Sequence, residues 1–308
     1  MPIILVSKLK SFPLIYQSLL GLLNRLGYFD WKFRRNFPRY KPTARWEDRI
    51  ALVVTSPDNS KIDRVPQAGQ VQEDHQRMHN GIKIRLGSYY DYGNTLLLQQ
   101  NQGVHEPQEE YVFQEVLKVI PPGGTMLELG SYWAFYSMWF CQQVPSARCF
   151  MVEPDPYKMN FGRQNFHFNQ MEGTFIKGFV ADQSDTSTST PTLTVDEILH
   201  AQNIDHLHIL HADIQGYEYA MLQGAKTALQ QQMADFIFIS THSNELHAQC
   251  RACLLHYDYQ IIADANLDES YSWDGLLVAK SAKAPRLPTL AIEKRSGLPS
   301  ASGTVHLP

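Results

Sequence analysis

Two acidic residues and a glycine have the types and the spacing of a nucleoside-binding site. Glu128 and Gly130 come at the end of a short apolar run, and Glu153 ends a second run 23 residues after Gly130. Glycine lets the chain turn sharply and approach a ligand closely, because it has no Cβ. A carboxylate at the second position can accept hydrogen bonds from both hydroxyls of a ribose. Glu128 can accept a hydrogen bond from a cationic amino group, so the three residues predict an adenosine-containing ligand.

A second set of polar residues follows later apolar runs. Asp213 ends the run at 206–213, His242 follows the run at 235–241, and Glu218 lies just beyond Asp213. Asp213 can orient a hydroxyl acceptor, serve as general base or bind a divalent metal that acidifies the hydroxyl. His242 is the neighbouring candidate for the base, because histidine ordinarily titrates near neutral pH. Glu218 either completes a metal site or caps a helix, and the need for a metal stays open.

A parallel sheet must bring these residues together. Residues from about 105 to 280 alternate short apolar runs with helical patterns, which predicts βαβ units. We expect strands at 125–129, 147–153, 174–178, 206–213, 235–241, 259–264 and 274–280. Helices are expected between them, at 107–120, 135–143, 156–168, 195–202, 217–232 and 245–256. Only a short loop separates the last two strands, so they should pair antiparallel.

This order of elements predicts an α/β fold with a seven-stranded, mostly parallel sheet, an antiparallel last strand and helices on both faces. Such a sheet is typical of Rossmann-like class I methyltransferases, which use S-adenosylmethionine. A nicotinamide-binding Rossmann domain normally does not end in that hairpin. It also has a G-x-G-x-x-G turn, whereas Tyr132 and Ala134 stand here where glycines would be. Ligands of open α/β sheets bind beyond the carboxyl ends of the strands, which is where the candidate residues fall.

One segment resembles the signature of the FkbM family of methyltransferases. It reads HILHADIQGYEYAMLQGA at 208–225, and the matching positions are Asp213, Gly216, Glu218, Leu222, Gly224 and Ala225. The flanking stretches GVHEPQEEYVF, LTVDEIL and FIFISTHS agree with it, so the resemblance covers about residues 100–280. It implies a class I methyltransferase fold, S-adenosylmethionine as donor, and O-methylation of a hydroxyl on a sugar, glycolipid or related metabolite.

The resemblance also organises the predicted site. The expected cofactor-binding residues are Glu128, Gly130, Ser131, Tyr132, Ser137, Glu153, Pro154 and Asp182. Asp213, His242 and Glu218 are expected to face the acceptor as catalytic residues, with a metal undecided. Glu106 matches a family glutamate and is expected at the pocket entrance, and the stretch GSYYDYGN at 87–94 is expected to offer the acceptor an aromatic face.

One position departs from the family pattern. Ala134 stands where a second glycine usually follows four residues after the first, at Gly130. Its methyl group is either accommodated by a small shift or weakens cofactor binding. Two alternatives therefore stay open. The protein is either a catalytically degenerate member that binds a partner or glycan, or a nicotinamide-dependent oxidoreductase.

Composition narrows the class of protein. The 308-residue chain is 44% hydrophobic and 19% charged, as in an ordinary globular protein, and its formal net charge of −4 argues against a nucleic-acid partner. Four cysteines are too few for a disulfide framework, which favours a reducing, cytoplasmic compartment. The string at 247–256 does not predict a zinc site, because its histidines and cysteines cannot converge from one helix. His206 and His208 are expected to be solvated.

The chain divides into three predicted regions. Residues 1–100 hold an amphipathic helix, with Ile15, Leu19, Leu22, Leu23 and Leu26 at helical spacing, and an irregular substrate or lid segment. Residues 101–281 form the catalytic domain, and 282–308 a disordered tail. The stretch 31–45 contains six Lys or Arg and no acid. The N-terminal helix and this basic stretch either pack on the domain as helix and linker, or attach the protein to an anionic membrane surface at its inner face.

Overall fold

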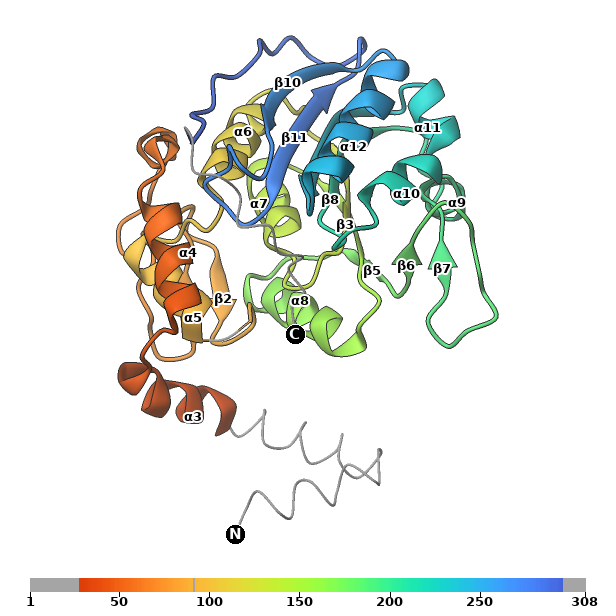
Figure 1. Ribbon diagram of the computed structural model, residues 1–308. Helices are drawn as coiled ribbons and strands as arrows, with labels where there is room; N and C mark the ends of the chain where they lie inside the picture. Colours follow the sequence, from red (N-terminus) through yellow and green to blue (C-terminus); the bar gives the residue numbers. More distant parts are fainter. Residues whose placement is uncertain (1–27, 91, 296–308) are drawn as a thin grey trace.

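A seven-stranded sheet forms the centre of the molecule (Figure 1) in the computed structural model, which describes residues 28–90 and 92–295. The strand order is β10-β11-β9-β8-β3-β4-β5. Neighbours from β9 to β5 pair parallel, whereas β11 pairs antiparallel with both β9 and β10. The strands are β3 (Thr125–Leu129), β4 (Arg148–Val152), β5 (Thr174–Ile176), β8 (Leu207–Ala212), β9 (Ala234–Thr241), β10 (Gln260–Ala265) and β11 (Gly275–Lys280). This arrangement confirms the predicted fold class.

Helices cover both faces of the sheet because side chains alternate along its strands. Met126 packs in one core with α6 (Pro107–Leu117), α7 (Phe135–Gln143) and α8 (Pro156–Phe168). Leu127 and Leu129 of the same strand pack in a second core on the opposite face. This core includes α9 (Val195–Ala201), α10 (Glu218–Gln223), α11 (Lys226–Gln230) and α12 (Asn244–His256). Successive side chains of a strand point to opposite faces, so each strand contributes to both cores. No helix in the described part of the chain is both long enough and apolar enough to cross a membrane.

The helix expected at 217–232 is interrupted. It forms α10 and α11 with a break at Gly224 and Ala225. A side chain at Gly224 would overlap the carbonyl oxygen of Ala181, so the glycine lets another segment reach the helix. That segment leads from β6 (Phe179–Val180), which pairs with β7 (Thr192–Leu193) in a small parallel sheet that the sequence did not indicate.

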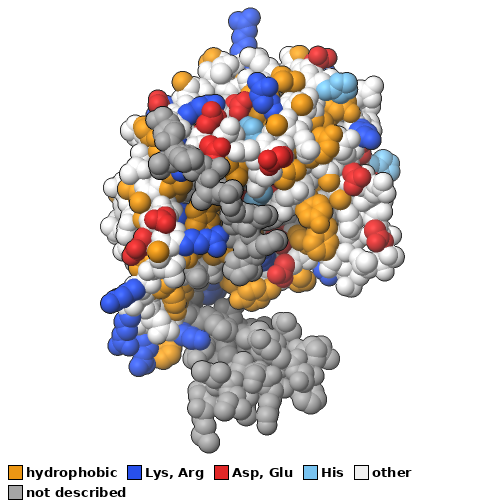
Figure 2. Space-filling view, in the orientation of Figure 1, with side chains coloured by type: hydrophobic (Ala, Val, Ile, Leu, Met, Phe, Trp, Pro, Cys, Tyr) orange, Lys and Arg blue, Asp and Glu red, His pale blue; other side chains and the backbone are white. Residues whose placement is uncertain are grey.

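The N-terminal segment is more regular than expected. It contains α3 (Tyr28–Asn36), η1 (Phe37–Arg39), α4 (Ala44–Val54), η2 (Pro57–Lys61), β1 (His75–Arg77), β2 (Lys83–Arg85) and α5 (Tyr92–Gln100). Met78, Ile82 and Leu98 join the same core as α6 and α7, so this segment packs directly on the sheet domain. The sequence pattern did not predict helix α5, because this helix buries the polar residues Asn94 and Thr95 and has no apolar stripe. Lys and Arg side chains gather over α3 (Figure 2). The predicted amphipathic helix upstream lies outside the described residues.

The region after β11 also corrects an expectation. Residues 282–295 were expected to be disordered, yet Leu287 is buried and the Leu290 amide donates to the carbonyl of Ile262. The Glu293 amide donates to Asp58, which is itself fully buried. This stretch therefore lies against the domain through backbone contacts, which its Pro-rich composition did not reveal. Residues 296–308 of the predicted tail lie outside the described residues.

Candidate active site

A cavity of about 480 Å³ lies where β3, β4 and β8 end. The predicted residues in its wall are Glu106, Glu128, Gly130, Ser131, Tyr132, Glu153, Pro154 and Asp213. Four other predicted residues, Ser137, Asp182, Glu218 and His242, do not line it. The carboxyl ends of parallel strands thus gather residues that are far apart in sequence, as the general rule for open α/β sheets requires.

Gly130 closes the first strand in a conformation that a side chain would prevent. Its φ is +75°, and its amide and that of Ser131 both donate to the carbonyl of Val152. A Cβ at this position would overlap the carbonyl oxygen of Asp213. The glycine therefore lets the turn after β3 lie directly against the turn after β8, which joins the two halves of the site.

Glu153 is held rigidly at the end of β4. Its carboxylate accepts from the amides of Tyr132 at 3.1 Å and Asp155 at 2.9 Å, and the residue is 4% exposed. Burial raises the pKa of Glu153, while these amides and Lys158 oppose that shift. A fixed acceptor in the cavity wall suits a diol, because each carboxylate oxygen has a further lone pair.

Glu128 is equally buried, and a hydrogen bond to it accounts for the position of Ser137. It accepts from the amide of Ser137 at 3.1 Å, so Ser137 orients Glu128 and does not line the cavity. Burial raises the pKa of Glu128 to about 7. Asp182 does not reach the wall, which is formed by Gly178, Phe179, Val180 and Ala181 just before it.

Behind Asp213 lies a cluster of ion pairs around His242. The Nε2 atom of His242 is 3.3 Å from Asp213 Oδ1 and 3.3 Å from Asp274 Oδ1, and its Nδ1 atom is 2.8 Å from Glu218 Oε1. Glu218 is fully buried and also accepts from the amide of Gly216. The Asp213 side chain remains 35% exposed toward the cavity. Glu218 and His242 therefore fix the position of Asp213.

This geometry corrects the role predicted for His242. Burial alone lowers the pKa of His242, but its hydrogen bonds to Asp213 and Glu218 and the charge of Asp274 raise it to about 11. An imidazole that is already protonated at neutral pH cannot act as general base. Both ring nitrogens face carboxylates, so His242 links Asp213 to Glu218.

Three charged residues of the site escaped the sequence reasoning. His211 Nε2 lies 2.6 Å from Glu109, which also accepts from Ser240. Burial disfavours charged His211, yet its hydrogen bond with Glu109 raises its pKa overall. Asp274 directly precedes β11, which runs antiparallel to β9. The start of β11 therefore lies at the same edge of the sheet as the carboxyl ends of the parallel strands, and Asp274 lies there too. The predicted antiparallel pair was therefore a signal that could have located Asp274.

An aromatic wall completes the cavity from the N-terminal segment. The rings of Tyr89 and Trp133 stack at 4.1 Å and 12°, and the amide of Tyr90 donates to the hydroxyl of Tyr132. Tyr89 and Tyr90 both line the cavity. Behind them Arg49 of α4 is 4% exposed, with its guanidinium 4.3 Å from the centre of the Trp273 ring. Burial opposes its charge, but Tyr89, Asp274 and Glu106 raise the pKa of Arg49 overall.

The stability of the fold is expected to fall as pH rises from about 6.5 to 10. His105 is 2% exposed, and its ring nitrogens lie 2.6 Å from Glu110 and 3.2 Å from Glu106. Burial disfavours its charge, yet these acids raise the pKa of His105 to about 10. Its stabilising effect is complete below the unfolded pKa of about 6.5 and lost as pH passes 10. Each proton released changes the free energy of unfolding by up to about 1.4 kcal/mol per pH unit.

Urea unfolding across this pH range measures the effect. His105→Gln should make the dependence shallower, with His242 supplying the remainder, whereas exposed His256→Gln should leave it unchanged. An identical slope in His105→Gln would show that the ion pairs with Glu106 and Glu110 do not stabilise the fold.

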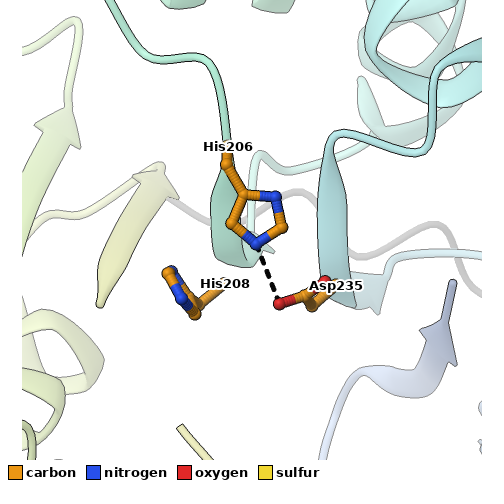
Figure 3. Close-up of side chains that lie close together, drawn as sticks. All are labelled: His206, His208 and Asp235. Atoms are coloured by element: carbon orange, nitrogen blue, oxygen red, sulfur yellow. Dashed lines mark hydrogen bonds and ion pairs between the residues drawn. The ribbon is translucent and has the colours of Figure 1, made fainter. Parts of the chain in front are cut away.

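A separate cluster lies at the opposite end of the sheet (Figure 3). His206, His208 and Asp235 place ligand-type atoms within 4.8 Å of one another, and His206 Nε2 is 3.0 Å from Asp235 Oδ2. However, His208 Nδ1 accepts a hydrogen bond from the amide of Thr125. Neutral histidine carries one ring proton, so the proton of His208 is on Nε2 and no lone pair is left for a metal there. We therefore read the cluster as a structural contact.

Two solved structures show limited similarity to this chain. The chain is similar to TrmK of M. capricolum in complex with S-adenosylhomocysteine, at 12% identity and a TM-score of 0.40 over 56% of this chain and 69% of that one. It is also similar to precorrin-6y C5,15-methyltransferase of Geobacter metallireducens, at 14% identity and a TM-score of 0.40 over 57% of this chain and 89% of that one. No curated protein matches the sequence.

A family model matches the sequence from the end of β4 to the start of β10. Residues 153–261 match the model of the methyltransferase FkbM domain. The matched region begins at Glu153, spans β5 to β9 and α12, and includes Asp213, Glu218 and His242. It also contains the whole signature at 208–225, which confirms the resemblance. Residues 153–261 of this chain therefore match the methyltransferase FkbM domain.

Proposed function

We propose that this protein is an S-adenosylmethionine-dependent O-methyltransferase that acts on a hydroxyl of a sugar, glycolipid or related metabolite. One observation carries the proposal. In a chain with an FkbM domain, the turn at Gly130 and the carboxylate of Glu153 share one cavity with the exposed carboxylate of Asp213. This arrangement supports a donor pocket next to an acceptor pocket.

The cavity residues fit the methyl donor. The carboxylate of Glu153 can accept from both ribose hydroxyls, and Glu128 from the ammonium of the methionine part. Gly130 leaves the backbone bare where the turn borders the cavity, and Val180 and Ile214 add apolar surface suited to adenine. The bound donor supplies an electrophilic methyl group on a sulfonium. All other steps depend on how this chain places the acceptor.

Asp213 is the residue that can activate a hydroxyl. Burial opposes its charge, but the hydrogen bond from His242 lowers the pKa of Asp213 overall, so it is ionised at neutral pH. Its carboxylate can accept a hydrogen bond from the acceptor hydroxyl and take the proton of that hydroxyl. Protonated His242 and the buried Glu218 keep that carboxylate in place, which preserves the alignment that methyl transfer requires.

The aromatic wall supports a carbohydrate-like acceptor. Tyr89 and Tyr90 offer aromatic surface to the apolar sides of a sugar, with Trp133 stacked against Tyr89, and Glu106 offers a hydrogen-bond acceptor to its hydroxyls. The experiment is incubation of the protein with labelled S-adenosylmethionine and extracts of glycans and metabolites, followed by mass spectrometry. A hydroxyl compound that gains one methyl group would support the proposal. Transfer to an amine alone would contradict O-methylation.

Cofactor binding gives a direct prediction. Glu153→Ala should weaken S-adenosylhomocysteine binding by about a hundredfold or more, because two charge-assisted hydrogen bonds contribute about 1.5–3 kcal/mol each. Calorimetry measures the affinity, and exposed Glu172→Ala is the matched control. Unchanged affinity in Glu153→Ala would contradict the assignment. Binding of a nicotinamide cofactor in place of S-adenosylhomocysteine would favour the oxidoreductase alternative.

Ala134 is expected to have little influence on that affinity. It adopts the left-handed conformation with φ at +59°, but it is fully buried, does not line the cavity and faces Gly162 of α8. Ala134→Gly removes about 1 kcal/mol of backbone strain and loses a buried methyl group contributing about 0.8 kcal/mol. Binding and unfolding experiments should both give values close to wild type. A large gain in affinity would instead show that the methyl group obstructs the site.

A further inference from the structure

The strongest unassigned feature is a basic face formed by α3, η1 and the start of α4. We define it by the exposed side chains of Lys32, Arg34, Arg35, Arg39, Lys41 and Arg45. No acidic residue occurs between residues 31 and 45, although the chain as a whole has a formal net charge of −4. Figure 2 shows Lys and Arg side chains gathered over α3, at the lower left of that view. This segment thus carries a local excess of positive charge in a chain that is negative overall.

These charges have no ion-pair partner among the residues that the structure describes. In the part of the chain that the structure describes, the ion pairs of Lys and Arg involve Lys61, Lys118, Arg251 and Lys294, none of which belongs to the basic face. Arg35 lies over the ring of Trp31 at 5.3 Å and Arg45 over that of Trp273 at 4.4 Å, and such contacts keep the charge. An anionic partner can therefore engage all six side chains.

The surroundings of the basic face favour a lipid surface over a polynucleotide. Trp31 is 48% exposed beside Lys32 and Arg35, and tryptophan next to basic residues is typical of proteins at the boundary between lipid headgroups and acyl chains. The sequence just upstream, from Ile15 to Leu26, carries apolar residues at helical spacing. A nucleic-acid backbone makes no use of such apolar groups, whereas an anionic bilayer binds both kinds.

The basic face is anchored to the segment that lines the cavity. The ring of Phe33, which is 9% exposed, lies 4.6 Å from that of Tyr92, and the Tyr40 ring lies 5.5 Å from it. Tyr92 begins α5, two residues after the cavity-lining Tyr90. We propose that the basic face docks this protein on an anionic phospholipid bilayer, with α3 lying on the headgroups. Docking would hold the aromatic wall of the cavity at a fixed orientation to the membrane.

Vesicle binding tests the proposal on the full-length protein. Wild type should sediment with vesicles of phosphatidylcholine and phosphatidylserine, not with phosphatidylcholine alone, and rising ionic strength should release it. Replacing Lys32, Arg34, Arg35 and Arg39 together with glutamine should weaken binding at least about tenfold, since each basic residue contributes about fivefold. Trp31→Ala should cause a partial loss and leave the salt dependence intact.

A matched variant separates the basic face from overall charge. Arg163, Lys226, Lys283 and Arg286 are exposed elsewhere, and changing all four to glutamine removes the same charge but should leave vesicle binding unchanged. Because all eight side chains are exposed, both variants should keep the wild-type Tm. Equal losses in the two variants, or unaltered binding in the first, would overturn the proposal. Binding to a single-stranded oligonucleotide but not to vesicles would also overturn the proposal. The assay contains no methyl donor, so its outcome is independent of the proposed function.

Discussion

Gly130→Ala is expected to abolish cofactor binding and to destabilise the fold. Gly130 has a φ of +75°, and a Cβ there would overlap the carbonyl oxygen of Asp213. The overlapping atoms belong to the backbone of the two turns and cannot rotate away as the end of a side chain can. The turns after β3 and β8 must therefore separate. We expect S-adenosylhomocysteine affinity to fall beyond measurement, and the free energy of unfolding to drop by about 2–4 kcal/mol, above the cost of the backbone conformation alone.

The chain supplies a control for the conformational part of this effect. Gly123 has a similar φ of +79°, but a Cβ there would meet nothing within 4 Å. Gly123→Ala should therefore lose only about 1–2 kcal/mol and keep full affinity. Calorimetry and urea unfolding of the two variants separate strain from overlap. If Gly130→Ala behaves like Gly123→Ala, the close contact with Asp213 does not organise the site.

The second large effect is expected at Asp213. Asp213→Asn keeps the size of the side chain and an oxygen to accept from His242, but removes the proton acceptor. We expect kcat to fall by about 10²–10⁴-fold, the usual contribution of a general base, with S-adenosylhomocysteine affinity within a fewfold of wild type. Methyl transfer to the acceptor found by mass spectrometry measures kcat.

Asp274→Asn is the matched comparison. Asp274 lies as close to His242 Nε2 as Asp213 does, at 3.3 Å, yet it does not line the main cavity. We therefore expect a much smaller loss of kcat from Asp274→Asn. Comparable losses would indicate that the shared charge around His242 matters more than a proton acceptor at Asp213. Full activity in Asp213→Asn would show that another group activates the hydroxyl.

Sequence patterns located the cavity-lining residues at the strand ends where the relevant signals are local. The residues Glu128, Gly130, Glu153 and Asp213 all follow apolar runs, and a parallel sheet puts the ends of such runs at one edge. The same reasoning could not assign the surrounding roles. Ser137 was expected to contact the cofactor, but its amide holds Glu128, a relationship set by how α7 packs on β3.

Charge states depended on contacts that the sequence does not display. His242 has the residue type of a base, and only the carboxylates of Asp213, Glu218 and Asp274 around it keep it protonated. Likewise, no local pattern connects Arg49 with Trp273, which come from opposite ends of the chain. The pKa of a buried group follows from its neighbours in space, so residue type alone could not predict it.

The sequence by itself determined the α/β class, the reversed last strand, the FkbM signature and the strand-end residues of the cavity. Hydrophobic period, turn residues and motif spacing are short-range properties, and they can be read directly. The tertiary structure decided that α5 and residues 282–295 pack on the domain, that His242 positions Asp213, and that the methyl group of Ala134 faces α8 and not the cavity. Each of these depends on long-range packing, because burial and partner choice are fixed only when distant segments meet.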